Sequence, residues 1–113
     1  MNDYHEPPDE LDAQTRDFTR ALNSLKEEIE AIAWYQERIA TSDNEQLKAI
    51  LGHNRDEEME HAAMSLEWLR RNMANWDTAL RTYLFTSAPI QKVEQAANGE
   101  TSETPQAAEQ GNA

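Results

Sequence analysis

A carboxylate and an imidazole stand three residues apart near the middle of the sequence, as Glu58 and His61. Residues three apart lie on one face of an α-helix, so these two side chains can bind one metal ion together. A second acidic cluster lies upstream, at residues 27–30, and reads Glu-Glu-Ile-Glu. Because the chain has no cysteine, disulfides and thiolate metal sites are excluded, and a Glu and His ligand set suits iron or manganese.

The composition describes an acidic chain of one small domain. Its 113 residues include 22 acidic and 10 basic side chains, which give a formal charge of -12 at pH 7. This excess of negative charge argues against nucleic acid or an anionic membrane as a partner and favours cations. No stretch approaches the ~20 apolar residues of a membrane span, and the polar, acidic N-terminus does not resemble a signal peptide. We therefore expect a cytoplasmic protein.

Two long helices are predicted, over residues 9–40 and 44–72, because apolar residues recur every three or four positions and glycine and proline are scarce there. The packing seam of the first helix consists of Ala21, Leu25, Glu28, Ile32, Tyr35 and Ile39. A carboxylate on such a seam costs free energy unless it is paired or bound to a metal. Glu28 is therefore a candidate ligand, and the alternative is that it reaches water from the edge of the seam.

The short polar segment 41–44 predicts a turn, so the two helices should run antiparallel, with Ser42 or Asp43 capping the second. Glu28 and Glu58 each lie 15 residues from Asp43. At ~1.5 Å per residue, both lie about 20 Å from the turn. We therefore expect the two acidic clusters to face each other at the same height.

The number of ligands decides what kind of site this is. Di-iron carboxylate bundles use a Glu from each of two helices and Glu-x-x-His from each of the other two. This chain supplies half of that set, so a two-fold dimer would complete both the four-helix bundle and the ligands. Glu57 competes with Glu58 because it lies four residues before His61, and we prefer Glu58 because three-residue spacing is the pattern of these bundles.

The predicted fold is therefore all-α: an antiparallel two-helix hairpin plus a short third helix over residues 76–83. A helical turn is expected to follow through Gln95. Residues 1–8 are interpreted as a flexible tail and 96–113 as a disordered tail, because their composition cannot bury a core. Residues 9–95 form the helical domain.

Four segments resemble the encapsulated ferritins, ferritin-like proteins carried as cargo inside encapsulin nanocompartments. They are Glu-Glu-Ile-Glu-Ala-Ile-Ala-Trp-Tyr at 27–35, His-Asn-Arg-Asp-Glu-Glu-Met-Glu-His-Ala-Ala-Met at 53–64, Leu-Glu-Trp-Leu-Arg-Arg at 66–71 and Leu-Arg-Thr-Tyr-Leu-Phe-Thr at 80–86. The resemblance implies a ferritin-like four-helix bundle made by dimers, and an annular decamer of five dimers. It also implies an encapsulin shell as partner and a place inside that compartment. The family's short targeting segment of Gly-Ser-Leu type has no match in the final residues, Glu-Gln-Gly-Asn-Ala.

The family's functional positions fall on residues of this chain. The resemblance places the di-iron ligands at Glu28, Glu58 and His61. It places an aromatic pair at Trp34 and Tyr35, with the tyrosine near the metal. The carboxylates through which iron arrives would be Glu27 and Glu30. A weaker peripheral cation site would use His53, Glu57 and Glu60, and calcium or zinc could occupy this site or the di-iron site.

The function implied by the resemblance is ferroxidase activity, the oxidation of Fe(II) to Fe(III) with dioxygen or peroxide as acceptor, which feeds iron to storage. Two alternatives use the same features. One is a dimeric helical protein that binds or buffers metal without turnover, and the other is an acidic hairpin that only scaffolds a partner.

Overall fold

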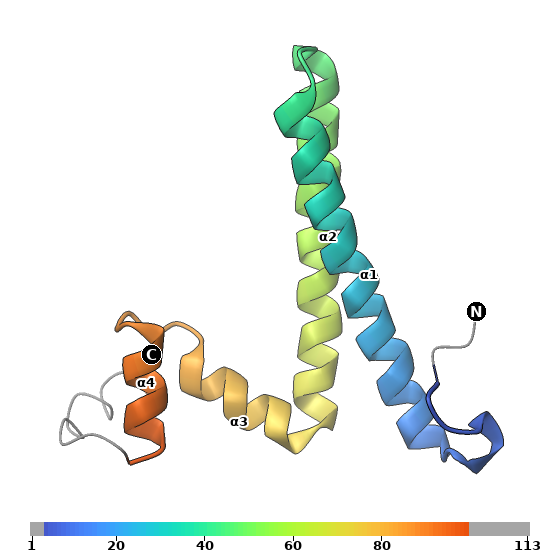
Figure 1. The fold of residues 1–113 in the computed structure, drawn as a ribbon, viewed down its shortest axis with the longest axis vertical. Helices are drawn as coiled ribbons and strands as arrows, with labels where there is room; N and C mark the ends of the chain where they lie inside the picture. Colours follow the sequence, from blue (N-terminus) through green and yellow to red (C-terminus); the bar gives the residue numbers. More distant parts are fainter. Residues whose placement is uncertain (1–3, 100–113) are drawn as a thin grey trace. The chain divides into compact units, whose positions relative to one another are not determined.

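The computed structural model describes residues 4–99, and this part of the chain is helical without any strand (Figure 1). In chain order it contains the 3-10 helix η1 (Pro8–Glu10) and the α-helices α1 (Ala13–Thr41), α2 (Glu45–Asn72), α3 (Ala74–Tyr83) and α4 (Ile90–Ala97). The predicted all-α class is confirmed. Of the two predicted tails, residues 1–3 and 100–113 lie outside the described residues.

The first long helix starts four residues later than predicted. Residues 8–10 form the separate helix η1, and Asp12 caps the start of α1. Asp12 is the N-cap, and its side chain accepts a hydrogen bond from the Thr15 backbone N–H at 2.7 Å. That bond holds the pKa of the Asp12 carboxyl below its ordinary value and satisfies one of the free N–H groups of the first turn. Arg16 donates to the Pro8 carbonyl, which ties η1 to the start of α1.

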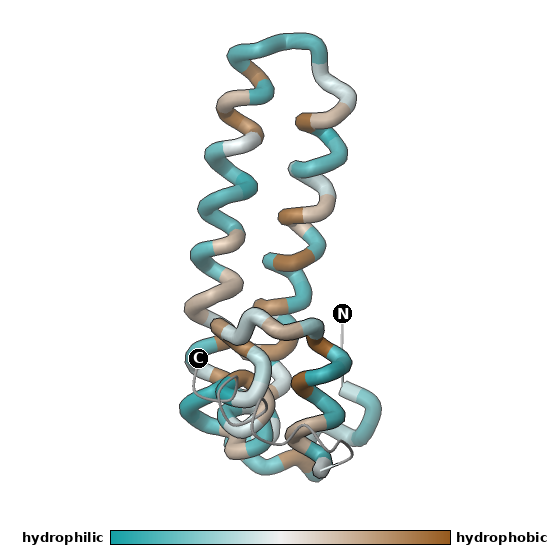
Figure 2. The backbone as a smooth tube through the Cα atoms, turned by 90° about the vertical axis from the view of Figure 1, so that its left-hand side faces the viewer, coloured by the Kyte–Doolittle hydropathy of each residue, from teal (hydrophilic) through white to brown (hydrophobic). Residues whose placement is uncertain are grey.

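The turn between α1 and α2 falls where the sequence predicts, but a different residue caps α2. Asn44 accepts from the Leu47 N–H at 2.9 Å through its side-chain oxygen, and the Asn44 N–H donates to Ser42 Oγ at 3.1 Å. The prediction of Ser42 or Asp43 as the cap is therefore wrong, because Asn44 stands three residues before a free helical N–H and Ser42 instead closes the turn. Both views show α1 and α2 as an antiparallel hairpin (Figures 1 and 2).

The chain divides into two compact units, and the division falls between Leu69 and Arg70. The first unit is the hairpin, and its predicted seam on α1 is confirmed. All six seam positions are half-buried: Ala21, Leu25, Glu28, Ile32, Tyr35 and Ile39. The apolar residues beside the seam are more open, with Leu22 38% and Ile29 54% exposed. Glu28 therefore belongs to the packed face of α1.

On α2 an inner seam and an outer stripe run side by side. The inner seam repeats every four and three residues, and all its positions are half-buried or buried: Leu51, Arg55, Glu58, Ala62, Ser65 and Leu69. The outer stripe is apolar but between 39% and 59% exposed: Leu47, Ile50, Met64 and Trp68. The hydropathy colouring shows apolar segments recurring along both helices of the hairpin (Figure 2). A single hairpin thus leaves a large part of its apolar surface uncovered.

The second unit contains α3 and α4, which pack against each other around the buried Val93. The helix α3 begins at Ala74, two residues earlier than predicted, and α4 is a helix of eight residues where the sequence predicted a turn. Between them, Phe85 has a positive φ of 63° and is 86% exposed. None of the described helices is long and apolar enough to cross a membrane.

Asp77 of α3 binds two arginines of the second unit, Arg70 at the end of α2 and Arg81 on its own helix. It accepts hydrogen bonds from Arg70 and, at 2.9 Å, from Arg81. The Arg70 bond is the main cause that holds the Asp77 pKa below its ordinary value of 3.8, and Arg81 adds to it. Because the folded pKa is lowered, the stabilisation is present above pH 3.8 and is lost as the pH falls through the folded pKa.

Replacing Asp77 by Asn is therefore expected to speed hydrogen exchange of the α3 amides at pH 6. The difference from the wild type should shrink as the pH falls below 3.8. The exposed acid of the same unit supplies the control: Glu94→Gln should leave α3 exchange at its wild-type rate. Equal exchange in Asp77→Asn and wild type at pH 6 would contradict the expected role of Asp77.

Candidate metal centre

Glu58 and His61 occupy successive turns in the middle of α2. The Glu58 Oε1 and His61 Nδ1 atoms are 3.4 Å apart, and the two side chains are 27% and 49% exposed. Glu58 belongs to the inner seam, whereas His61 lies three residues before Met64 of the outer stripe. The pair therefore shares one helix surface, as predicted, and stands between the packed and the open side of the hairpin.

Glu28 does not meet this pair within one chain. Its Oε1 atom accepts a hydrogen bond from Ser65 Oγ at 2.9 Å, in a half-buried setting. Ser65 lies seven residues after Glu58 on the same seam, which is about 10 Å further along the helix. Counting residues from the turn predicts equal heights for the two acidic clusters, but the Glu28 carboxylate is engaged by Ser65 and forms no three-ligand group with Glu58 and His61 in one hairpin.

The direction of side chains on helices explains the offset. Each Cα–Cβ bond tilts toward the N-terminus of its own helix. In an antiparallel hairpin, side chains at equal height therefore tilt apart: Glu28 toward the open end and Glu58 toward the turn. A second hydrogen bond between the helices has the same sense, since Arg55 donates to Gln36 Oε1 at 2.8 Å although Arg55 lies five residues further from Asp43 than Gln36.

Within residues 4–99 of a single chain, no three side chains of His, Asp or Glu gather closely enough to hold a metal ion. The hairpin presents two incomplete donor sets, Glu28 on α1 and Glu58 with His61 on α2. Carboxylate oxygens and an imidazole nitrogen bind both oxidation states of iron, so the donor chemistry fits iron. These three side chains of one chain are too few and too far apart to form a complete metal site, so further ligands are needed.

The predicted peripheral residues lie on the outer surface of α2. The His53 Nε2 and Glu57 Oε1 atoms are 3.4 Å apart, with side chains 70% and 55% exposed. Glu60 is exposed on the same helix and does not form a three-residue group with them. Glu27 and Glu30 are exposed on either side of Glu28.

Tyr35 lies on the seam of α1 and is half-buried, and the Arg38 guanidinium lies over its ring at 5.3 Å. Its neighbour Trp34 is 54% exposed. Tyr35 and Glu58 each stand seven residues nearer the turn than Glu28 and Ser65 do. The same tilt therefore directs the Tyr35 ring toward the side of the hairpin where Glu58 lies.

Sequence reasoning missed Ser65. Serine has no ligand signature, and the residue interrupts no charge or aromatic pattern. Its position could have been noticed, because Ser65 lies seven residues after Glu58 and therefore on the same seam of α2.

A hairpin of two long helices that carries a seam glutamate and a Glu-x-x-His pair defines a ferritin-like helical protein. The chain belongs to the EncFtn-like family, whose model matches residues 3–87. It is 63% identical to the ferritin-like protein of Thermotoga maritima over 101 residues, 89% of each chain. It is 55% identical to the encapsulated ferritin-like protein of Rhodospirillum rubrum over 95 residues, 84% of this chain and 68% of the relative.

A solved structure supports the fold. The crystal structure of a Nitrosomonas europaea protein matches with a TM-score of 0.77 and 53% identity, covering 79% of this chain and 98% of the other. The resemblance to encapsulated ferritins that the sequence suggested is confirmed by the family match and by these relatives.

Proposed function

We propose that two copies of this chain pair their hairpins and oxidise Fe(II) to Fe(III) at a di-iron centre between them. Each copy contributes Glu28, Glu58 and His61, and Glu58 bridges the two ions. The observation that carries the proposal is the division of donors in one chain: Glu28 and the Glu58–His61 pair are present but are not brought together.

The exposed apolar surface of the hairpin supports a second copy as the missing partner. The outer stripe has the helical spacing of a packing seam, yet its residues are 39% to 59% exposed. Large uncovered apolar surfaces mark association sites, and a second hairpin converts two helices into a four-helix bundle. His61 stands in line with this stripe, so the partner that covers the stripe also reaches the imidazole.

The charge distribution supports a cation such as Fe(II) as the substrate. Residues 4–69 hold 16 of the 22 acidic side chains and six of the 10 basic ones. The acidic excess therefore belongs to the hairpin, where it attracts cations. Glu27 and Glu30, exposed beside Glu28, are suited to pass Fe(II) inward, and the His53–Glu57 pair offers a weaker outer position.

In the proposed reaction two Fe(II) ions give up one electron each, and dioxygen takes two electrons and two protons to become hydrogen peroxide. The glutamates neutralise the added positive charge of Fe(III), and a carboxylate can change between bridging and terminal binding as the ions are oxidised. In the proposed centre the Tyr35 hydroxyl hydrogen-bonds to Glu58 and fixes that ligand.

The test is to add Fe(II) to the purified protein without oxygen, measure bound metal and native mass, and then admit oxygen. We expect two Fe(II) per dimer, followed by oxygen uptake faster than in a protein-free solution. Binding without accelerated uptake would instead assign a metal-buffering role. No tight binding at all would leave a scaffold role and overturn the proposal.

Association with an encapsulin shell is the second part of the proposal. One relative is named an encapsulated ferritin-like protein, and a Myxococcus xanthus relative, 46% identical over 48 residues, is named an encapsulin nanocompartment cargo protein. Oxidised iron would then leave the bundle for storage inside the compartment. Co-expression with an encapsulin and recovery of this chain within intact shells would support this part.

A further inference from the structure

Ser65 is a polar residue on the packed face of α2, and its hydroxyl donates a hydrogen bond to the Glu28 carboxylate. Ser65 Oγ donates to Glu28 Oε1 at 2.9 Å across the hairpin. The residue belongs to the inner seam and stands four residues after His61 and seven after Glu58. The hydrogen bond therefore holds the Glu28 carboxylate over the same helix face that carries the other proposed ligands.

We propose that Ser65 is a positioning residue for iron binding, which fixes Glu28 so that a second chain can complete the site. The inference rests on the proposed function and names a residue that the ligand pattern does not contain. A carboxylate has two oxygens, and the Ser65 hydroxyl binds Oε1. Ser65 does not engage the second oxygen, which can therefore bind an ion of the proposed centre between the two chains.

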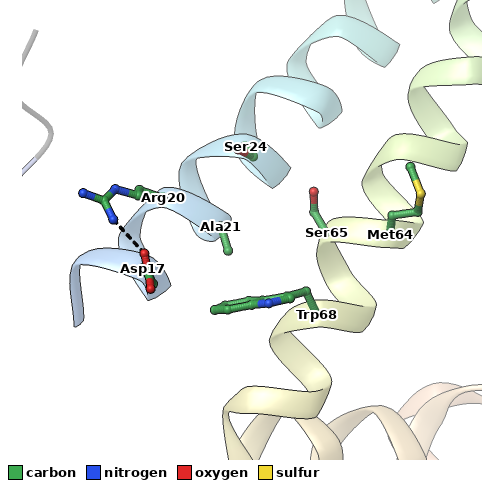
Figure 3. Close-up of a pocket in the computed structure, with 7 residues that line it drawn as sticks. All are labelled: Asp17, Arg20, Ala21, Ser24, Met64, Ser65 and Trp68. Carbon is green, nitrogen blue, oxygen red and sulfur yellow. Dashed lines mark hydrogen bonds and ion pairs between the residues drawn. The ribbon is translucent and has the colours of Figure 1, made fainter. Parts of the chain in front are cut away.

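The surroundings of Ser65 leave room for that approach. Ser65 lines an open groove of the hairpin together with Ala21 and Ser24 of α1 and Met64 and Trp68 of α2 (Figure 3). Met64 and Trp68 are the outer-stripe residues that the second copy is proposed to cover. The groove thus connects the surface where the partner docks with the bond that holds Glu28.

A hydrogen bond to a metal ligand acts by lowering the cost of orienting it, and loss of such a partner typically weakens metal affinity ~10–100-fold. Serine suits this role better than a stronger donor. Its hydroxyl is neutral, so it orients the carboxylate without neutralising the charge that the ion needs. It is also a weak ligand itself, so it does not compete with Glu28 for the ion.

The test measures Co(II) affinity of the full-length protein by its visible absorption, without oxygen, for wild type, Ser65→Ala and Ser65→Thr. We expect Ser65→Ala to bind Co(II) about 10-fold more weakly and Ser65→Thr, which keeps the hydroxyl, to bind within about 2-fold of wild type. Ser24→Ala is the matched control, since it removes a hydroxyl from the same groove and should change nothing. In Fe(II) oxidation, Ser65→Ala should raise KM and leave kcat near the wild-type value.

A double-mutant cycle distinguishes positioning from a general effect on structure. In a Glu28→Ala background, adding Ser65→Ala should not weaken Co(II) binding further, because Ser65 acts through Glu28. Wild-type or tighter affinity in Ser65→Ala, or equal losses in both backgrounds, would overturn the inference while the di-iron site stands. If wild type and Glu28→Ala bind Co(II) equally, it is the proposed metal centre that fails.

Discussion

Replacing Glu58 by Ala is expected to lower the rate of Fe(II)-dependent oxygen uptake by more than about 100-fold, because the loss of a direct ligand exceeds the ~10–100-fold effect of a residue that only orients one. In the proposed dimer the substitution removes the bridging carboxylate from both chains at once. The side chain is 27% exposed in the single hairpin, so the helix itself should tolerate the change. Oxygen-electrode traces at saturating Fe(II), with helical content checked by circular dichroism, measure the effect.

Two comparisons make the Glu58 result specific. Glu37→Ala removes an exposed carboxylate of α1 outside both donor sets and should retain the wild-type rate. Glu58→Gln keeps the shape of the side chain and should be nearly as inactive as Glu58→Ala. If Glu57→Ala abolished oxygen uptake and Glu58→Ala did not, the ligand pair would be Glu57 and His61. The proposed role of Glu58 as a ligand would then be wrong.

Metal binding is expected to strengthen the pairing of chains by about 100-fold for each of the two ions bound per dimer when free metal is at 100 times its dissociation constant, about 2.7 kcal/mol per ion. The reason is that residues 4–99 of one chain contain no three-ligand group, so in the proposed arrangement the ion binds the dimer and not the single chain. Sedimentation at a series of protein concentrations, with and without Co(II), measures the shift. Specific ferroxidase activity should fall when the protein is diluted below the dimer dissociation constant.

A substitution in the outer stripe tests the same linkage without touching a ligand. Met64 is 59% exposed in the single hairpin, so Met64→Glu should leave the helices intact while it prevents a second copy from covering the stripe. The expected product is a helical monomer with greatly weakened Co(II) binding. Wild-type Co(II) affinity in a sample that sediments as monomer would show that one chain is sufficient, contrary to the proposal.

The hairpin was predictable because its signals are long and repeated. The 4-3 row from Ala21 to Ile39 identifies the packed face of α1, and all its positions are half-buried. Helix ends depend on single side chains, and there the sequence was ambiguous: Asp12 and Asn44 act as caps, while other polar neighbours were equally plausible. The positive φ of Phe85 has no local signal, since phenylalanine rarely adopts it.

At the candidate site, the sequence predicted the shared surface of Glu58 and His61 but not the position of the Glu28 carboxylate. The spacing of Glu58 and His61 fixes their shared surface because it lies within one helix. The relation of Glu28 to Glu58 depends on two helices, and counting residues from the turn gives the heights of Cα atoms while it ignores the tilt of side chains. For the same reason Ser65 was invisible to pattern analysis, although it makes the hydrogen bond that places Glu28.

In the single hairpin, Glu28 accepts the Ser65 hydrogen bond, and the Glu58 side chain tilts toward the turn. Under the proposed arrangement, ferrous iron that meets such a lone chain finds no complete donor set among its described residues. A reaction that releases peroxide then begins after two copies have met, not when each one folds. Under this proposal, folding and the onset of redox chemistry are separated in time, and assembly sets their order.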